Sequence, residues 1–161
     1  MRMPDPSLHR TMKTSSPLLK VLSLALLLAT TAQASAAPDE AVVREMARQT
    51  NISAESIRRD HDACDSGITM SMKICAGYRW RLQDARLNAV YQKARDKARE
   101  MGHEASLVKA QRAWVAYRDA ACANEGEMGA GGGSAQGLYE LSCLEGLTKD
   151  RTQRIEDMLP S

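Results

Sequence analysis

The sequence predicts an all-α fold: a small antiparallel bundle of three main helices plus a short N-terminal helix, held by two disulfides. Apolar residues recur at helical spacing near 72–101, 106–122 and 138–159. A short turn and a glycine-rich stretch separate these segments, and four cysteines follow an export-type leader. No segment shows the alternation of apolar and polar residues that is typical of strands.

Residues 1–36 are predicted to be a signal peptide. Basic side chains precede a short apolar run at 21–29, and small residues with the sequence Ala34-Ser35-Ala36 follow it. The run is too short for a membrane span. Cleavage is expected after Ala36 or, as the alternative, after Ala34, and Met12 is an alternative start that keeps a complete signal. The mature protein is therefore expected in the periplasm or outside the cell, with no membrane span.

The net positive charge belongs to this leader. Residues 1–36 hold four of the 22 basic and one of the 20 acidic side chains, which leaves 18 basic and 19 acidic ones. Nucleic-acid binding therefore has no support from composition. The remaining chain is expected to form an N-terminal helix and connector at 37–63, followed by one helical domain at 64–161.

The first helix is expected at 38–50, and the charged segment 58–65 is expected to be a connector or a partial helix. The long helix near 72–101 ends at Gly102. Its apolar stripe runs along one side and consists of Trp80, Leu87, Tyr91, Ala94, Ala98 and Met101. The opposite side is predicted to be a solvated face that carries Arg79, Arg86, Lys93 and Lys97.

The helix at 106–122 is predicted to bury one face, formed by Leu107, Ala110, Trp114, Tyr117 and Ala121. Residues 124–137 contain six glycines and are predicted to be a mobile, non-helical loop. The last helix follows at 138–159.

Asp84 interrupts the apolar stripe of the long helix. A partly buried carboxylate in this position is expected to pair with a cation. We predict a structural pair with Arg118 on the neighbouring helix. No nucleophile, base pair or paired carboxylates accompany Asp84, so no catalytic residue is predicted and the protein is expected not to be an enzyme. No cofactor is predicted either.

Five candidate metal ligands lie in one segment: His61, Cys64, Met70, Met72 and Cys75. The four cysteines Cys64, Cys75, Cys122 and Cys143 are even in number in an exported chain, which implies two disulfides with three alternative pairings. A disulfide removes the thiols as ligands, so no metal site is predicted.

Several motifs occur together along the chain: Cys75-Ala76, Asp84-x-x-Leu87-Asn88-x-x-Tyr91, Ala110-Gln111-Arg112-x-Trp114-x-x-Tyr117-Arg118-Asp119-x-x-Cys122, the Gly131–Ser134 loop, Cys143 and Thr148-x-x-Arg151. This set resembles the LprI-like lysozyme inhibitor family. The resemblance covers about 64–159. It implies a small exported helical protein and, for some relatives, inhibition of lysozyme. This chain departs from the family in having Met70-Ser71-Met72 where relatives often carry an acidic residue.

We predict the pairings Cys64–Cys75 and Cys122–Cys143. The first closes the lead-in to the long helix, and the second ties the two ends of the glycine-rich stretch.

Two functions remain open: a binding protein that blocks a lysozyme, and an envelope structural or adaptor protein with another partner. Residues 79–118 carry ten basic and four acidic side chains, whereas residues 119–148 carry five acidic ones and no basic one. Because many lysozymes are basic, an inhibitor is expected to present an acidic surface. The predicted contact residues are Glu125, Glu127, Gly131, Gly132 and Gly133.

Overall fold

The computed structural model describes residues 36–159, and the predicted signal peptide lies outside them apart from its last residue. Within this range the chain forms five helices and no strand. They are α1 (Glu40–Gln49), α2 (Ala54–Asp60), α3 (Thr69–Glu100), α4 (Glu104–Ala130) and α5 (Gln136–Glu156). The all-α prediction is confirmed. The segment predicted as one helix and a connector contains two short helices.

The two short helices begin at side-chain caps. Asp39 Oδ1 accepts hydrogen bonds from the backbone N–H groups of Ala41 (2.8 Å) and Val42 (3.1 Å), and Ser53 Oγ accepts one from Ser56 N–H (3.1 Å). Both helices then bury apolar side chains against the first part of α3, in a cluster formed by Val42, Val43, Met46, Ile57, Ile74 and Tyr78. Residues 37–63 therefore share one core with the helix that follows them.

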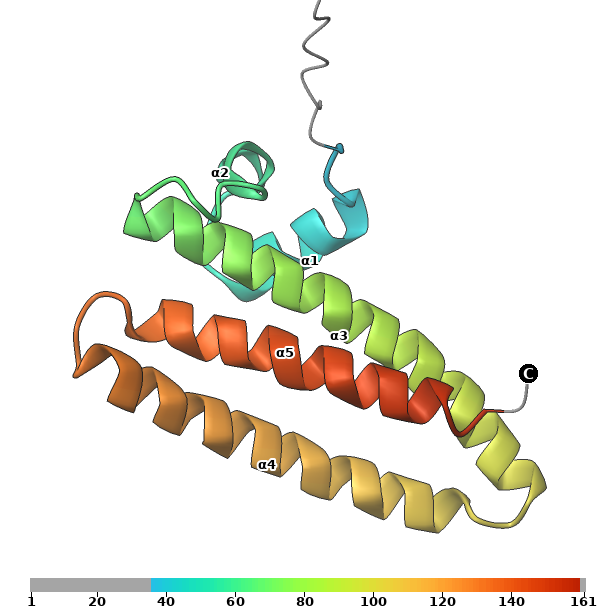
Figure 1. Cartoon of the computed structure of the whole chain (residues 1–161). Coiled ribbons are helices and arrows are strands. Elements are labelled where there is room, and N and C mark those ends of the chain that lie inside the picture. Colours follow the sequence, from blue (N-terminus) through green and yellow to red (C-terminus); the bar gives the residue numbers. More distant parts are fainter. Residues whose placement is uncertain (1–35, 160–161) are drawn as a thin grey trace, which may run out of the picture. The chain divides into compact units, whose positions relative to one another are not determined.

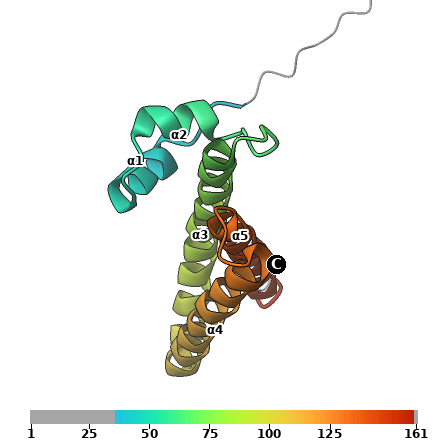
Figure 2. The same cartoon turned by 90° about the vertical axis from the view of Figure 1, so that its left-hand side faces the viewer.

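The three long helices are arranged with α5 between α3 and α4 (Figure 1). Arg79 and Arg86 of α3 bind Glu145 and Glu156 of α5, so α3 and α5 run in the same direction. α4 runs antiparallel to both, because Gly102, at φ 76°, reverses the chain between α3 and α4. Figure 2 shows α1 and α2 on the side of α3 away from α4.

A second core holds the long helices together. It is formed by Leu87, Val90 and Ala94 of α3 and Ile155 of α5, with Leu107 and Trp114 of α4 packed against it. The predicted solvated face of α3 is confirmed: Arg79, Arg86, Lys93 and Lys97 are all exposed. Arg79 and Arg86 remain exposed while they form the two ion pairs with α5 described above.

Both predicted disulfides are confirmed: Cys64–Cys75 and Cys122–Cys143, with Cα–Cα distances of 5.2 and 5.4 Å. The first joins the lead-in of α3 to its second turn. The second joins α4 to α5 close to the loop between them. Cys122 is fully buried, so this bond lies inside the seam of the two helices.

The predicted glycine-rich loop is largely helical, which corrects the boundary at 122. α4 continues to Ala130 and includes two of the six glycines. A Cβ on Gly126 would lie 3.2 Å from Gln136 O, and one on Gly129 would lie 2.9 Å from the ring of Tyr139. Glycine lowers helix propensity by about 1 kcal/mol, but here it allows α5 to approach α4 closely. Only residues 131–135 connect the two helices.

Candidate functional site

Several residues of the family-like motifs meet at one place, where α3, α4 and α5 pack together. Its centre is Arg118, whose exposed fraction is 8 %. Arg118 Nη1 lies 3.4 Å from Asp84 Oδ1 across the helices, and Nη2 lies 2.8 Å from Asp119 Oδ1 on its own helix. The structure thus brings the predicted pair Asp84 and Arg118 together and adds Asp119 as a second carboxylate.

Two indole rings flank this guanidinium group. The Arg118 Cζ atom lies 5.1 Å from the ring centroid of Trp114 and 5.9 Å from that of Trp80. The Cζ atom of Arg151, on α5, also lies 5.7 Å from the ring centroid of Trp114. Arg151 Nε donates a 3.0 Å hydrogen bond to Gln111 Oε1. Cation–π contacts of this kind contribute about 0.5–2 kcal/mol each, the higher values applying where the cation is desolvated. We interpret the cluster as a structural element that joins the three long helices.

The sequence predicted one contact of this cluster and missed the rest. Burial lowers the pKa of Arg151 below its ordinary value, yet an arginine keeps its charge at neutral pH. A half-buried cation needs a polar or aromatic partner, and the Thr148-x-x-Arg151 spacing placed Arg151 on the side of α5 that holds the buried Thr148. This spacing was the sequence signal from which the contact between Arg151 and Trp114 could have been predicted.

Removing Arg118 is expected to destabilise the protein more than removing Asp84. Arg118→Ala removes a buried side chain that lies between two indoles and pairs with two partly exposed carboxylates, at a cost of roughly 2 kcal/mol. Asp84→Ala leaves Arg118 with Asp119, so it should cost about 1 kcal/mol. In a double-mutant cycle by urea unfolding, the coupling between the two is expected to be about 1 kcal/mol. The exposed pair Arg58–Glu40 is the matched control, and equal coupling in both cycles would contradict a structural role for Asp84.

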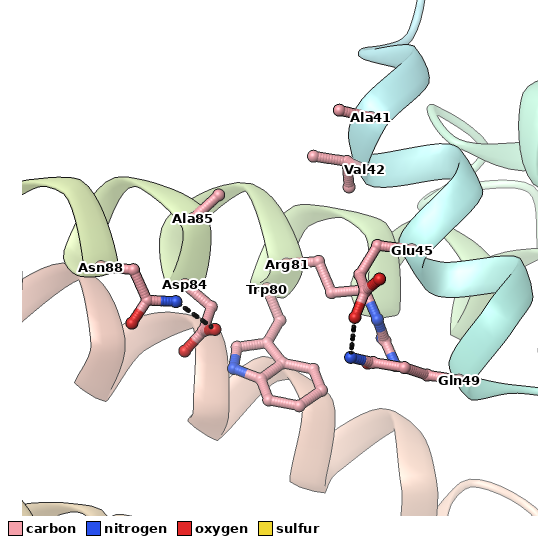
Figure 3. Close-up of a pocket in the computed structure, with 9 residues that line it drawn as sticks. All are labelled: Ala41, Val42, Glu45, Gln49, Trp80, Arg81, Asp84, Ala85 and Asn88. Carbon is pink, nitrogen blue, oxygen red and sulfur yellow. Dashed lines mark hydrogen bonds between the residues drawn. The ribbon is translucent and has the colours of Figure 1, made fainter.

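A cleft of about 390 Å³ lies between α1 and α3 (Figure 3). Trp80 and Arg81 line it from α3 together with Asp84 and Asn88, and Asn88 Nδ2 donates a 3.1 Å hydrogen bond to Asp84 Oδ2. Burial lowers the pKa of Arg81 below its ordinary value. No serine, cysteine, histidine or lysine lines the cleft, so it contains no nucleophile paired with a base.

The predicted partner-binding residues lie at the far end of α4. Glu125 and Glu127 are exposed on its last two turns, and the three glycines follow in the connection to α5. Gly131 and Gly132 have φ values of 55° and 80°, which only glycine adopts readily. The two glutamates therefore belong to a helix, and the prediction that they sit on a mobile loop is wrong, because packing against α5 extends the helix past them.

Residues 36–159 contain neither a metal-binding cluster nor a membrane-spanning helix. No group of three histidine, cysteine, aspartate or glutamate side chains in this range is placed to hold a metal ion. His61, one of the candidate ligands, instead makes polar contacts with the carbonyl oxygens of Arg58 and Ala36. Among the described helices, none has the length and hydropathy needed to cross a membrane.

Comparisons with known proteins agree with the motifs. A family model described as "Lysozyme inhibitor LprI" matches residues 61–155, which is more than half of the chain and extends from just after α2 through nearly all of α5. An uncharacterized protein of Rhizobium meliloti (strain 1021) is 36 % identical over 104 residues, covering 57 % of this chain and 74 % of that protein. No solved structure matches. With both disulfides and the Asp84–Arg118 cluster inside the matched region, the chain belongs to the LprI lysozyme inhibitor family.

Proposed function

We propose that this protein is an exported inhibitor that binds a lysozyme and blocks its muramidase activity by protein–protein contact. Membership of the LprI lysozyme inhibitor family is the observation that carries the proposal. The two disulfides support a location outside the cytoplasm, because such bonds persist in oxidising compartments. We place the mature protein in the periplasm or in the medium, after removal of residues 1–36.

The surface that we assign to the lysozyme is the acidic end of α4 and α5. Of the five acidic residues between 119 and 148, Asp119 and Glu145 are neutralised by Arg118 and Arg79. The other three, Glu125, Glu127 and Glu140, form no ion pair within the described residues. Opposite charge on two partners speeds their encounter and favours the correct orientation. A basic lysozyme is therefore the partner that this end of the molecule suits.

The direct test measures lysis. The signal-free protein is added to a c-type lysozyme acting on a bacterial cell-wall suspension, and turbidity is followed with time. The proposal predicts slower lysis that depends on the ratio of protein to lysozyme, together with capture of lysozyme by the immobilised protein. Unchanged lysis without capture would contradict the proposal and favour an envelope adaptor with another partner.

Neutralising the acidic end should slow association. For Glu125→Gln combined with Glu127→Gln, we expect the association rate constant for a basic lysozyme to fall by roughly tenfold at low salt, with little change in melting temperature. Raising the salt concentration should have the same effect on the parent protein, because it screens exposed charges. Surface plasmon resonance measures both.

A matched control keeps the net charge change and moves it elsewhere. Glu55→Gln with Asp65→Asn removes two exposed carboxylates from the other part of the molecule, in α2 and the α2–α3 connection. Its association rate should stay close to that of the parent. Equal slowing by both double variants would mean that only net charge matters and that the end of α4 is not the contact.

A further inference from the structure

A groove of about 300 Å³ runs along the seam between α4 and α5, beside the Cys122–Cys143 disulfide. It is lined from α4 by Tyr117, Ala121 and Glu125, and from α5 by Cys143, Gly146, Leu147 and Asp150. The α4 residues are four positions apart and so form one stripe of that helix. The cluster around Arg118 already described does not contribute to this lining.

The floor of the groove is open and combines apolar with polar surface. A Cβ on Gly146 would meet no atom within 4 Å, so the space above this residue is free. Ala121 and Leu147 supply short apolar side chains on either side. Tyr117 stands at the edge with 61 % of its surface exposed, although its position in the helix pattern predicts burial. A large aromatic ring left in solvent beside a groove is a common feature of interaction sites.

The charge of the groove has one sign. Glu125 and Asp150 both line it, and neither forms an ion pair or side-chain hydrogen bond within the described residues. No basic side chain is among the lining residues. The α1–α3 cleft differs, because Arg81 lines it and its Asp84 is already bound to Asn88 and Arg118. The α4–α5 groove is thus the better suited of the two to a positively charged group.

We propose that this groove receives a lysine or arginine side chain of the lysozyme. The methylene stem of that side chain packs on Ala121 and Leu147, over the space that Gly146 leaves free. Glu125 and Asp150 give the groove the negative charge that attracts its cationic end, and the exposed ring of Tyr117 offers a cation–π contact. This inference rests on the proposed function, and it identifies the class of residue by which the partner is held.

Three variants test the groove in different ways. Tyr117→Ala removes the ring, and Glu125→Gln with Asp150→Asn removes the charge. Gly146→Leu fills the floor without deleting any contact, and it should raise the melting temperature, because leucine favours a helix more than glycine does. Each is expected to weaken lysozyme binding, measured by isothermal titration calorimetry, by about tenfold or more. The control Met101→Ala, which shortens an exposed apolar side chain at the α3–α4 turn, should bind like the parent.

The outcomes separate this inference from the proposed function. If the parent inhibits lysozyme and the three groove variants bind it as tightly as the parent, the groove is not the contact, although inhibition stands. If the parent does not bind lysozyme, both proposals fail. Acetylation of the lysines of lysozyme removes their charge and leaves arginine unchanged. If acetylated lysozyme binds the parent much more weakly, and the loss is much smaller for Gly146→Leu, the occupant of the groove is a lysine. If acetylated lysozyme still binds the parent tightly, the occupant is an arginine.

Discussion

Replacing Cys122 and Cys143 together with alanine is expected to lower the free energy of unfolding by about 3 kcal/mol. The bond spans 21 positions of sequence, so its loss returns considerable freedom to the unfolded chain. It also joins α4 to α5 inside their seam, with Cys122 fully buried. Urea unfolding of the parent and the double variant under oxidising conditions measures the difference.

The bond between Cys64 and Cys75 serves as the comparison. It spans only 11 positions, so its removal should cost somewhat less by the same argument. Moreover, only the Cys122–Cys143 variant should loosen the acidic end of α4, which hydrogen exchange of the backbone amides reports. An unchanged midpoint for the Cys122→Ala, Cys143→Ala protein would mean that packing alone fixes α5 on α4.

Trp114→Ala is the second substitution with a large expected effect. We expect a loss of about 3 kcal/mol, at the lower end of the range for buried tryptophans, because this indole is only partly buried. The loss combines apolar contact with the second core and the cation–π contacts to Arg118 and Arg151. Thermal unfolding followed by circular dichroism measures it.

The conservative variant Trp114→Phe separates the two contributions. Phenylalanine keeps an aromatic face for the two guanidinium groups and loses part of the apolar area, so roughly half of the stability should return. A Trp114→Ala protein with the melting temperature of the parent would show that the indole does not join the helices. The cluster would then need another purpose.

The sequence predicted the elements that depend on local pattern. The three long helices and the first short one follow from apolar spacing, and the disulfide pairings follow from the short separations of Cys64 from Cys75 and Cys122 from Cys143. The contact between Asp84 and Arg118 was predictable for a related reason. A single carboxylate in an apolar stripe has to meet a cation, and Arg118 bordered the stripe of the next helix.

Residues whose placement depends on other helices were not predictable. Periodicity placed Tyr117 in the buried face of α4, yet Tyr117 is exposed and its neighbour Arg118 is buried. A guanidinium group becomes tolerable in that position only because Trp80, Trp114 and two carboxylates surround it, and they come from two helices. The apolar pattern along one helix does not show which partner side chains a neighbouring helix supplies.

The structure of the glycine-rich segment also depends on contacts between helices, which the sequence pattern does not show. Composition indicated a loop through 124–137, since glycine is a poor helix former. The structure uses Gly126 and Gly129 as points where α5 packs against the α4 backbone, and the ring of Tyr139 occupies the space at Gly129. Close packing of this kind becomes visible only when both helices are in place. As a result, the candidate site residues Glu125 and Glu127 lie on a helix.

Hydrogen–deuterium exchange of the protein lacking residues 1–36, with and without a c-type lysozyme, tests most directly whether the α4–α5 face binds lysozyme. We expect slower exchange on binding in residues 117–130 and 139–150, with no change in α1 and α2. Protection confined to α1 and α2 and the cleft they form with α3 would contradict the assigned face. Unchanged exchange throughout would contradict the binding itself.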